Sequence, residues 1–110
     1  MIIGVGCDIV SVNRFKNKDK SFVEKILSPN EINMYNTKIG KQKSEFLAGR
    51  FCAKEAIIKA LPKNKELDMT KIDIFYDKEK PKCMLYDYNI FISISHECDY
   101  AISYVCISSI

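Results

Sequence analysis

A long helix is predicted over residues 42–61. The residues here follow a helical period, and Pro62 ends the helix because proline disfavours helical geometry in the residue before it. At about 100° per residue, one face of this helix gathers apolar side chains that are expected to pack on a sheet. They are Phe46, Ala53, Ile57 and Ala60.

β-branched and aromatic runs dominate the chain after this helix. They predict strands at residues 72–76, 83–86, 90–95 and 100–107, and a further strand is expected at residues 2–9. Helices early and strands mostly late predict an α+β fold, with an antiparallel sheet packed against the long central helix. No repeat or linker interrupts the sequence, so residues 1–110 are expected to form a single domain.

A helix start is also marked between the first strand and the long helix. Ser28-Pro29-Asn30-Glu31 has the form of a capping box, with serine as the N-cap, proline at the first helical position and glutamate three residues after the cap. A helix of about nine residues is expected to follow and to end before Gly40.

Composition narrows the class of protein. No apolar run approaches the ~20 residues that span a bilayer, and no signal peptide follows Met1, so a soluble, cytoplasmic protein is expected. An organelle after removal of a leader remains an alternative. The five cysteines are odd in number and form no CxxC pair, which predicts reduced core thiols rather than a disulfide framework or a zinc site.

Positive charge is concentrated in two places. The net charge is +3, and only two of the 17 basic residues are arginines, Arg14 and Arg50. Lysines follow Arg14 closely, and a second group lies at residues 38–43; such patches suit an acidic partner or phosphates, or form a solvated surface. Nucleic-acid binding is disfavoured because arginine-rich runs are missing and the aromatic residues fall mostly at core-like positions.

Glu55 interrupts a second stripe of apolar or small side chains on the long helix. This carboxylate is costly to desolvate unless a cation or several donors meet it. The alternative is an exposed pair with Lys59, one turn later, worth a few tenths of a kcal/mol. The stripe consists of Ala48, Phe51, Cys52 and Ile58.

Asp8 lies in an unusual strand. Alternation places it on the same face as Gly4 and Gly6, and glycine in a strand often marks close approach of a ligand or another backbone. The alternative is that Asp8 only caps the turn that follows. The single histidine, His96, ends the strand that carries Ser93 and Ser95, and a lone histidine at a strand end is more often a surface or satisfied residue than a catalytic one.

Three segments together resemble the holo-acyl-carrier-protein synthases, the short trimeric type of 4′-phosphopantetheinyl transferase. The chain opens with Ile3-Gly4-Val5-Gly6-Cys7-Asp8-Ile9, followed by Arg14. Its most distinctive stretch is Glu45-Phe46-Leu47-Ala48-Gly49-Arg50-Phe51-Cys52-Ala53-Lys54-Glu55-Ala56, with Lys59-Ala60 after it. The third segment is Ile92-Ser93-Ile94-Ser95-His96 and then Tyr100-Ala101. All three occur in the family's order and cover essentially the whole chain.

The resemblance implies a fold, a reaction and a set of site residues. The reaction transfers 4′-phosphopantetheine from coenzyme A to a serine of apo acyl carrier protein, releases 3′,5′-ADP, depends on Mg²⁺ and supports fatty acid biosynthesis. Asp8 and Glu55 are the implied metal ligands, with Glu55, Lys59 and His96 catalytic. Coenzyme A would meet Lys41, Lys43, Arg50, Lys80, Pro81, Ser95 and His96, and the carrier would dock on Arg14, Lys18 and Lys25.

Some points stay open at this level. The base that takes the serine proton is either Glu55 or a water on the magnesium, and a small protein that binds the carrier or a nucleotide without turnover is the alternative function. A homotrimer with interfacial active sites would cover the stripe around Glu55. The chain departs from the family's usual glycines between Leu61 and Ile72 and at Glu79, before the Lys80-Pro81 pair, which is expected to reshape the rim of the coenzyme A pocket.

Overall fold

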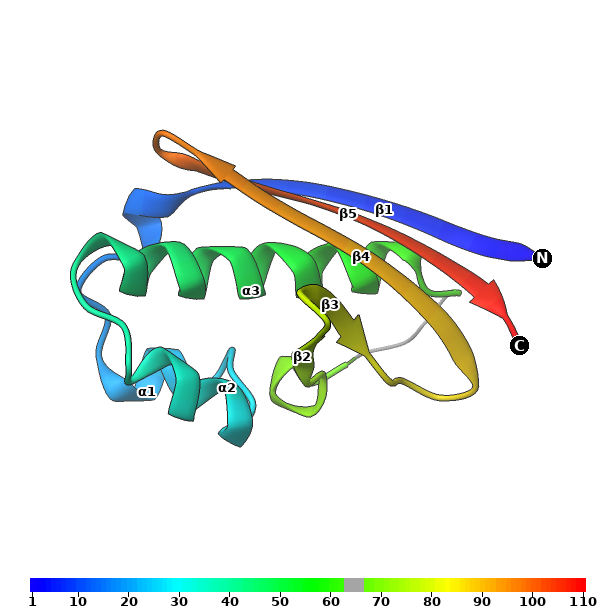
Figure 1. Ribbon diagram of the computed structural model, residues 1–110, viewed down its shortest axis with the longest axis horizontal. Coiled ribbons are helices and arrows are strands. Elements are labelled where there is room, and N and C mark those ends of the chain that lie inside the picture. The colour runs from blue at the N-terminus through cyan, green and yellow to red at the C-terminus, as the bar shows by residue number, and fades with distance from the viewer. Residues whose placement is uncertain (63–66) are drawn as a thin grey trace.

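A three-stranded antiparallel sheet lies over one long helix (Figure 1). The computed structural model describes residues 1–62 and 67–110. The sheet has the strand order β1-β5-β4, formed by β1 (Ile2–Ser11), β5 (Tyr100–Ser109) and β4 (Tyr88–Glu97), and α3 (Lys41–Ala60) packs beneath it. The predicted α+β class, with an antiparallel sheet on a long helix, is confirmed.

Smaller elements complete the fold, with α1 and α2 on the side of α3 that faces away from the sheet (Figure 1). They are the 3₁₀ helix η1 (Val12–Phe15), α1 (Lys20–Glu24), α2 (Pro29–Tyr35), the 3₁₀ helix η2 (Met69–Lys71) and the two-stranded hairpin of β2 (Ile74–Asp77) and β3 (Lys80–Cys83). The capping box at Ser28 and Glu31 is present as predicted, although α2 is shorter than expected. The sequence pattern missed α1 and both 3₁₀ helices.

The strand predicted at residues 83–86 is wrong. The observed strand is β3, which pairs Lys80 with Asp77 and Pro81 with Tyr76. Lys78 and Glu79 form the turn with φ of 50° and 67°, the left-handed conformation of a two-residue hairpin turn. Glu79 therefore adopts the backbone shape that glycine favours, so the hairpin forms without the family's usual glycine. The other departure from the family's usual glycines lies between Leu61 and Ile72, and its residues 63–66 lie outside the described residues.

The two glycines of β1 allow close contact with the backbone of α3. A Cβ on Gly4 would lie 1.8 Å from the Ala60 carbonyl oxygen, and one on Gly6 would lie 2.0 Å from the Ala56 carbonyl oxygen. Close approach of another backbone, one of the two alternatives from the sequence, is therefore the reason for these glycines. Asp8, on the same face, is consequently brought close to α3.

Uncovered apolar surface lies on the sheet and not on the helix. In the stripe around Glu55, Ala48 and Cys52 are fully buried within the chain, and the Phe51 ring packs on Phe15 at 5.2 Å between centroids. The sheet and η1 of the same chain therefore cover Ala48 and Cys52, whereas Phe51 and Ile58 stay half-buried, so coverage of the rest of the stripe by a neighbouring chain stays a prediction. Phe46, predicted to face the sheet, instead packs on Tyr35 at 6.4 Å between centroids.

The five cysteines are free thiols, but they do not all belong to the core. Cys52 and Cys83 are buried, whereas Cys7 and Cys98 are exposed. Burial raises the pKa of the Cys52 thiol to about 11, so it stays protonated and donates toward the Asp8 carbonyl oxygen at 3.2 Å. In the part of the chain that the structure describes, no helix is long and apolar enough to cross a membrane.

Candidate active site

Asp8 and Lys59 form an ion pair where β1 crosses α3. Lys59 Nζ lies 3.0 Å from Asp8 Oδ1 and donates a second hydrogen bond to the Cys7 carbonyl oxygen at 3.1 Å. The hydrogen bond to Asp8 raises the pKa of Lys59, and Glu55 adds a further attraction. Lys59 is thus a fixed cation on the exposed side of two carboxylates.

The alternatives that the sequence left open for these acids are now resolved. Ser11, not Asp8, is the N-cap of η1, and it makes no side-chain capping bond. Lys59 donates a hydrogen bond to Asp8 on β1, so its contacts are not limited to Glu55 on the same helix. Among the described residues, no side chain donates a hydrogen bond to Glu55, which is half-buried and leaves its carboxylate available to a cation or a proton.

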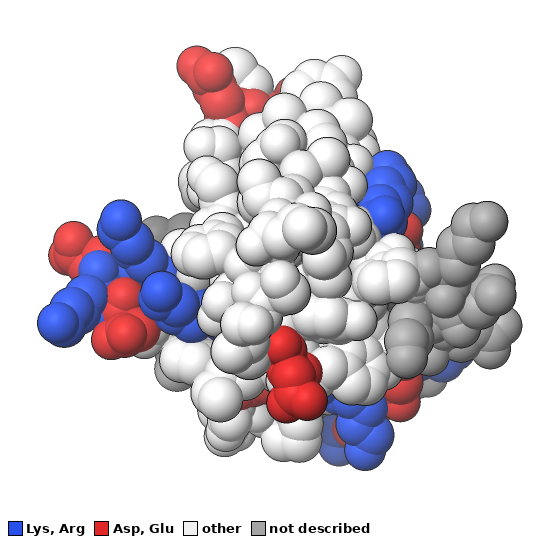
Figure 2. Space-filling model, turned by 90° about the vertical axis from the view of Figure 1, so that its right-hand side faces the viewer, with Lys and Arg blue, Asp and Glu red and all other residues white. Residues whose placement is uncertain are grey.

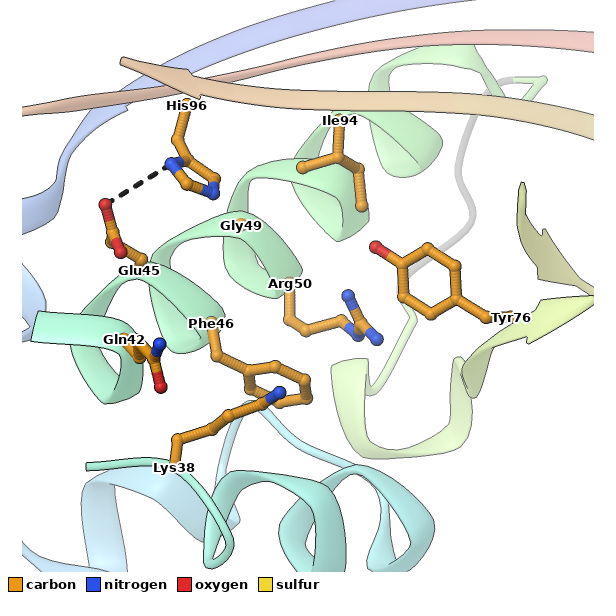
Figure 3. A pocket seen from close by; sticks show the side chains of 9 residues that line it. All are labelled: Lys38, Gln42, Glu45, Phe46, Gly49, Arg50, Tyr76, Ile94 and His96. Carbon is orange, nitrogen blue, oxygen red and sulfur yellow. Dashed lines mark ion pairs between the residues drawn. The ribbon is translucent and has the colours of Figure 1, made fainter. Parts of the chain in front are cut away.

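A cavity of about 340 Å³ lies on another flank of α3, beneath the end of β4 (Figure 3). Its basic residues are Lys38 and Arg50, His96 hangs into it from β4, and Tyr76 of the β2–β3 hairpin forms the opposite wall. The remaining lining residues are Gln42, Glu45, Phe46, Gly49 and Ile94.

Arg50 is held at the bottom of this cavity with one edge unpaired. The side chain is 3% exposed, and its guanidinium carbon lies 4.5 Å from the centroid of Phe46 and 5.2 Å from that of Tyr76. Nε forms an ion pair with Glu31 Oε2 at 3.2 Å but without hydrogen-bond geometry, and Nη2 is buried without a hydrogen-bond partner among the described residues. A buried cationic donor without a partner is costly, so this atom is suited to receive an anion.

Glu31 anchors Arg50 through a buried network. Both Glu31 and Lys54 are fully buried, and Lys54 Nζ donates to Glu31 Oε1 and to the carbonyl oxygens of Ile26 and Met69 at 2.8 and 2.9 Å. Burial lowers the pKa of Lys54, and the Glu31 carboxylate opposes that shift. Because Lys54 occupies Oε1, Oε2 is left for Arg50 and for the Ile74 amide at 3.2 Å.

Lys41 and Lys43 lie in a separate groove. Together with Lys16 and Lys18 they line a cavity of about 500 Å³ between η1 and the start of α3, and none of its lining residues is acidic. The structure therefore groups these lysines with the residues that follow Arg14, whereas Lys38 is the lysine that lines the cavity of Arg50 and His96.

The other predicted site residues are more scattered. Ser95 is exposed on the outer face of the sheet, opposite Ile102, and so points away from the His96 cavity. Lys80 and Pro81 belong to the hairpin that provides Tyr76, but neither lines that cavity. Arg14 stacks on Phe15 at 5.4 Å from the ring centroid. Lys18 and Lys25 share a hollow at the start of α1.

The carboxylate pair and the His96 cavity occupy different flanks of one chain. Arg50 and Glu55, five positions apart on α3, project about 140° apart. Asp8 belongs to β1 and His96 to β4, with β5 between them. Each cluster therefore carries only part of the chemistry that the sequence predicted.

Several residues of the site were missed from the sequence. From the sequence Glu31 is only a capping residue, Lys38 is only a member of the basic group at residues 38–43, and Glu45 and Tyr76 have no predicted role. Tyr76 reaches the cavity through the hairpin whose position was mispredicted. The EFLAGRF stretch held Glu45, but only the fold shows that it faces His96.

Comparisons with known proteins agree with this architecture. Residues 4–105 match the model of the 4′-phosphopantetheinyl transferase superfamily. The chain is 54% identical over 103 residues to a holo-[acyl-carrier-protein] synthase of Mycoplasma mycoides, covering 93% of this chain and 91% of that one. It is 40% identical over 112 residues to that of Staphylococcus saprophyticus, covering 96% and 97%.

A solved structure gives the same result. The holo-(acyl-carrier-protein) synthase of Bacillus anthracis, a complex with CoA (3′,5′-ADP), superposes with a TM-score of 0.92 at 36% identity and covers 100% of this chain and 99% of that one. The chain therefore belongs to the 4′-phosphopantetheinyl transferase superfamily and, within it, to the holo-acyl-carrier-protein synthases. It is an enzyme of this family, and the alternative of a binding protein without turnover is set aside.

Proposed function

We propose that this enzyme transfers 4′-phosphopantetheine from coenzyme A to a serine of apo acyl carrier protein, with Mg²⁺, and releases 3′,5′-ADP. The observation that carries the proposal is the buried, unpartnered Nη2 of Arg50 in a cavity that also holds Lys38 and His96. Phosphate groups are the ligands that such donors favour. The relative from Bacillus anthracis is a complex with CoA (3′,5′-ADP), which supports coenzyme A as the phosphate donor.

The donor set fits a magnesium ion. Magnesium in proteins is usually bound by one or two carboxylates, with substrate phosphates and waters completing six oxygens. Asp8 has one oxygen free of the Lys59 bond, and Glu55 accepts no hydrogen bond from the described side chains. Among these residues no cluster of three or more His, Cys, Asp or Glu is present, so the remaining ligands would come from substrate and water. When bound, the ion would neutralise charge on the phosphoryl oxygens.

The chain's own residues would then position the reactants. The serine oxygen forms a bond to the phosphorus that carries pantetheine, the bond from this phosphorus to the 3′,5′-ADP oxygen breaks, and the serine proton leaves to Glu55 or to solvent. Lys59 would stabilise the oxygens that gain charge, since it is already held beside Asp8. Arg50 and His96 would fix the phosphates of coenzyme A.

Mass spectrometry of the carrier tests the reaction directly. Apo acyl carrier protein is incubated with the enzyme, coenzyme A and Mg²⁺, and the carrier is weighed. The proposal expects the mass of one phosphopantetheine on the carrier and an equal amount of 3′,5′-ADP in solution. An unchanged carrier mass would refute it.

Carrier docking is proposed on the surface formed by Arg14, Lys18 and Lys25. The neighbouring lysine groove, with Lys16 and Lys43, extends the positive charge of this end of the molecule. Opposite charge on a partner mainly speeds encounter and makes the association rate depend on salt. An acidic carrier helix is the partner that this surface suits.

Arg14→Glu is expected to slow association with the carrier and to flatten its salt dependence. Charge reversal replaces attraction by repulsion at the docking surface, so the rate constant should fall by about tenfold at low salt. Stopped-flow association at several salt concentrations measures both effects. Lys82→Glu, the reversal of an exposed charge on β3, is the control that should leave the salt slope closer to that of the wild type. Equal slopes for Arg14→Glu and wild type would remove Arg14 from the docking surface.

A homotrimer is proposed to complete the active site. The outward-facing residues of β1, β5 and β4 are all described, and Glu97 is their only charged member. Val5, Ile9, Phe91 and Tyr104 are each more than half exposed there. Figure 2, which views the end of the molecule with the two termini, shows a column of mostly uncharged side chains with most of the charged side chains on either side of it. A patch of this kind marks an interface, and a second copy would bring another Asp8 edge toward the His96 cavity.

Ile9→Lys is expected to shift the protein from trimer to monomer. The substitution places a charge on the uncovered sheet face, where Ile9 of the edge strand β1 pairs with Ile102 of the central strand β5. Sedimentation velocity over a range of protein concentrations measures the change. Met84→Lys, at a residue that is 83% exposed and lies outside the three strands, is the control and should remain trimeric. A wild type that sediments as a monomer would refute the trimer itself.

The relatives from Mycoplasma mycoides and Staphylococcus saprophyticus are holo-[acyl-carrier-protein] synthases, and the product is proposed to support fatty acid biosynthesis in the cytoplasm. One domain over residues 1–110 is proposed to carry the whole reaction, with two subunits contributing to each site.

A further inference from the structure

The His96 cavity contains a carboxylate in a place where phosphates are proposed to bind. Glu45 is the only acidic residue among those that line it, and the side chain is 19% exposed. Beside a phosphate this charge is repulsive. A carboxylate that only repelled the substrate would weaken binding, so its contacts need an explanation.

His96 supplies that explanation. Glu45 Oε2 lies 3.3 Å from His96 Nδ1, and the two side chains reach toward each other from the start of α3 and the end of β4. Figure 3 marks this contact and shows the second ring nitrogen of His96 turned away from Glu45, on the side of Gly49. Glu97, the neighbour of His96 in β4, lies on the opposite face of the strand and cannot serve as a second partner.

We propose that Glu45 is a positioning residue for His96, and the proposal rests on the proposed binding of coenzyme A in this cavity. The contact at 3.3 Å is an ion pair, and by accepting a hydrogen bond from Nδ1 Glu45 would fix the orientation of the ring and direct Nε2 toward the ligand. A histidine that donates Nδ1–H to Glu45 and Nε2–H to a phosphate oxygen is protonated, and both of its nitrogens are then donors. Glu45 thus aligns a cation that Lys38 and Arg50 supplement from other sides of the cavity.

The nitrogen spectrum of His96 tests the contact without any substrate. Because His96 is the only histidine, long-range ¹H–¹⁵N correlation of uniformly labelled protein reports one imidazole. At a pH where this ring is neutral, the wild type is expected to show the proton mainly on Nδ1. Glu45→Ala should move the ring toward a mixture of both tautomers. Glu24→Ala, which removes an exposed glutamate from α1, should leave the spectrum unchanged.

The affinity for coenzyme A is a second test. Positioning of His96 by Glu45 and simple charge repulsion by Glu45 predict opposite changes in this affinity. Calorimetry should show that Glu45→Ala weakens binding on the order of tenfold, as loss of a partner does for metal-bound histidines. Charge repulsion alone predicts tighter binding in the same variant. In a His96→Ala background the positioning role is gone, so adding Glu45→Ala should leave binding equal or make it tighter.

The outcomes separate the two proposals. Tighter or unchanged binding for Glu45→Ala, an equal loss in the His96→Ala background, or an unaltered tautomer would each overturn the positioning role. Failure of the wild type to bind coenzyme A would refute the proposed function instead, and the tautomer of His96 would still decide whether Glu45 orients this ring.

Discussion

Glu31→Ala is expected to destabilise the fold by about 3–5 kcal/mol. The change leaves the fully buried Lys54 without its carboxylate and also frees Arg50 Nε, and removal of one partner from a buried ion pair costs about this much. Domains of this size are stable by only about 5–15 kcal/mol, so this loss is a large share of the total and should lower the denaturant midpoint clearly. Chemical denaturation at one fixed protein concentration measures the difference.

Two further variants identify the cause of that loss. Glu24→Ala removes an exposed glutamate and should change stability by no more than about 0.5 kcal/mol. In the wild type the Ser28 backbone N–H donates a hydrogen bond to Glu31 Oε1 at 2.8 Å. Glu31→Gln keeps an oxygen that can accept this bond but removes the charge. It is expected to lose most of the same stability, and a wild-type value would assign the effect to capping rather than to charge.

The stability of Glu31→Ala is expected to depend on pH, because Lys54 is then a buried lysine without a carboxylate partner. Burial already lowers the pKa of Lys54, and removal of Glu31 takes away the main opposing attraction. The unfolded chain then binds more protons than the folded one at pH values between the lowered pKa and the ordinary lysine value of about 10.4. In the wild type the Lys54 pKa is lowered less, so the stability deficit should shrink as pH rises from the Lys54 pKa of the folded variant to that of the folded wild type, and should be constant above it. A deficit that is constant with pH would indicate lost packing instead of an unpaired charge.

Local patterns predicted those parts of the fold that depend on neighbouring residues. The capping box at Ser28, the helix ended by Pro62 and the strand that begins at Ile2 all arise from short-range geometry. Gly4 and Gly6 were recognised as a place of close approach, but only the packing shows that the Ala56 and Ala60 carbonyl oxygens are what they approach.

Contacts between residues far apart in the sequence could not be predicted from local sequence patterns. Glu31 and Lys54 are 23 positions apart, and nothing local to either residue indicates that both are buried and paired. The hairpin strand was placed late because β3, with the sequence KPKC, contains no β-branched or aromatic residue and includes a proline. For the site, the sequence and the family resemblance predicted Asp8, Glu55 and His96, while the placement of Lys41 and Lys43 away from His96 required the fold.

Asp8→Ala and Glu55→Ala are each expected to reduce turnover on the order of 100-fold or more. Each variant removes one of the two carboxylates proposed to hold Mg²⁺, and loss of electrostatic stabilisation at a reacting group typically costs this much. Neither residue fills the buried apolar core, so the thermal midpoint should change by only a few degrees. Carrier mass under single-turnover conditions measures the loss.

Asp8 has a second contact that must be separated from the proposed metal. If its role were only to hold Lys59, then Asp8→Ala, Lys59→Ala and the double variant would lose equal activity, and the concentration of Mg²⁺ would change none of them. If Asp8 binds the ion, raising Mg²⁺ should restore part of the activity of Asp8→Ala but not of Lys59→Ala, because the weakened ion site can be refilled by mass action. Asp87→Ala, at an exposed aspartate in the β3–β4 connection, is the control and should retain full turnover. Full activity in Asp8→Ala would exclude this carboxylate as a metal ligand, and the fixed pair with Lys59 would then be a structural contact between β1 and α3.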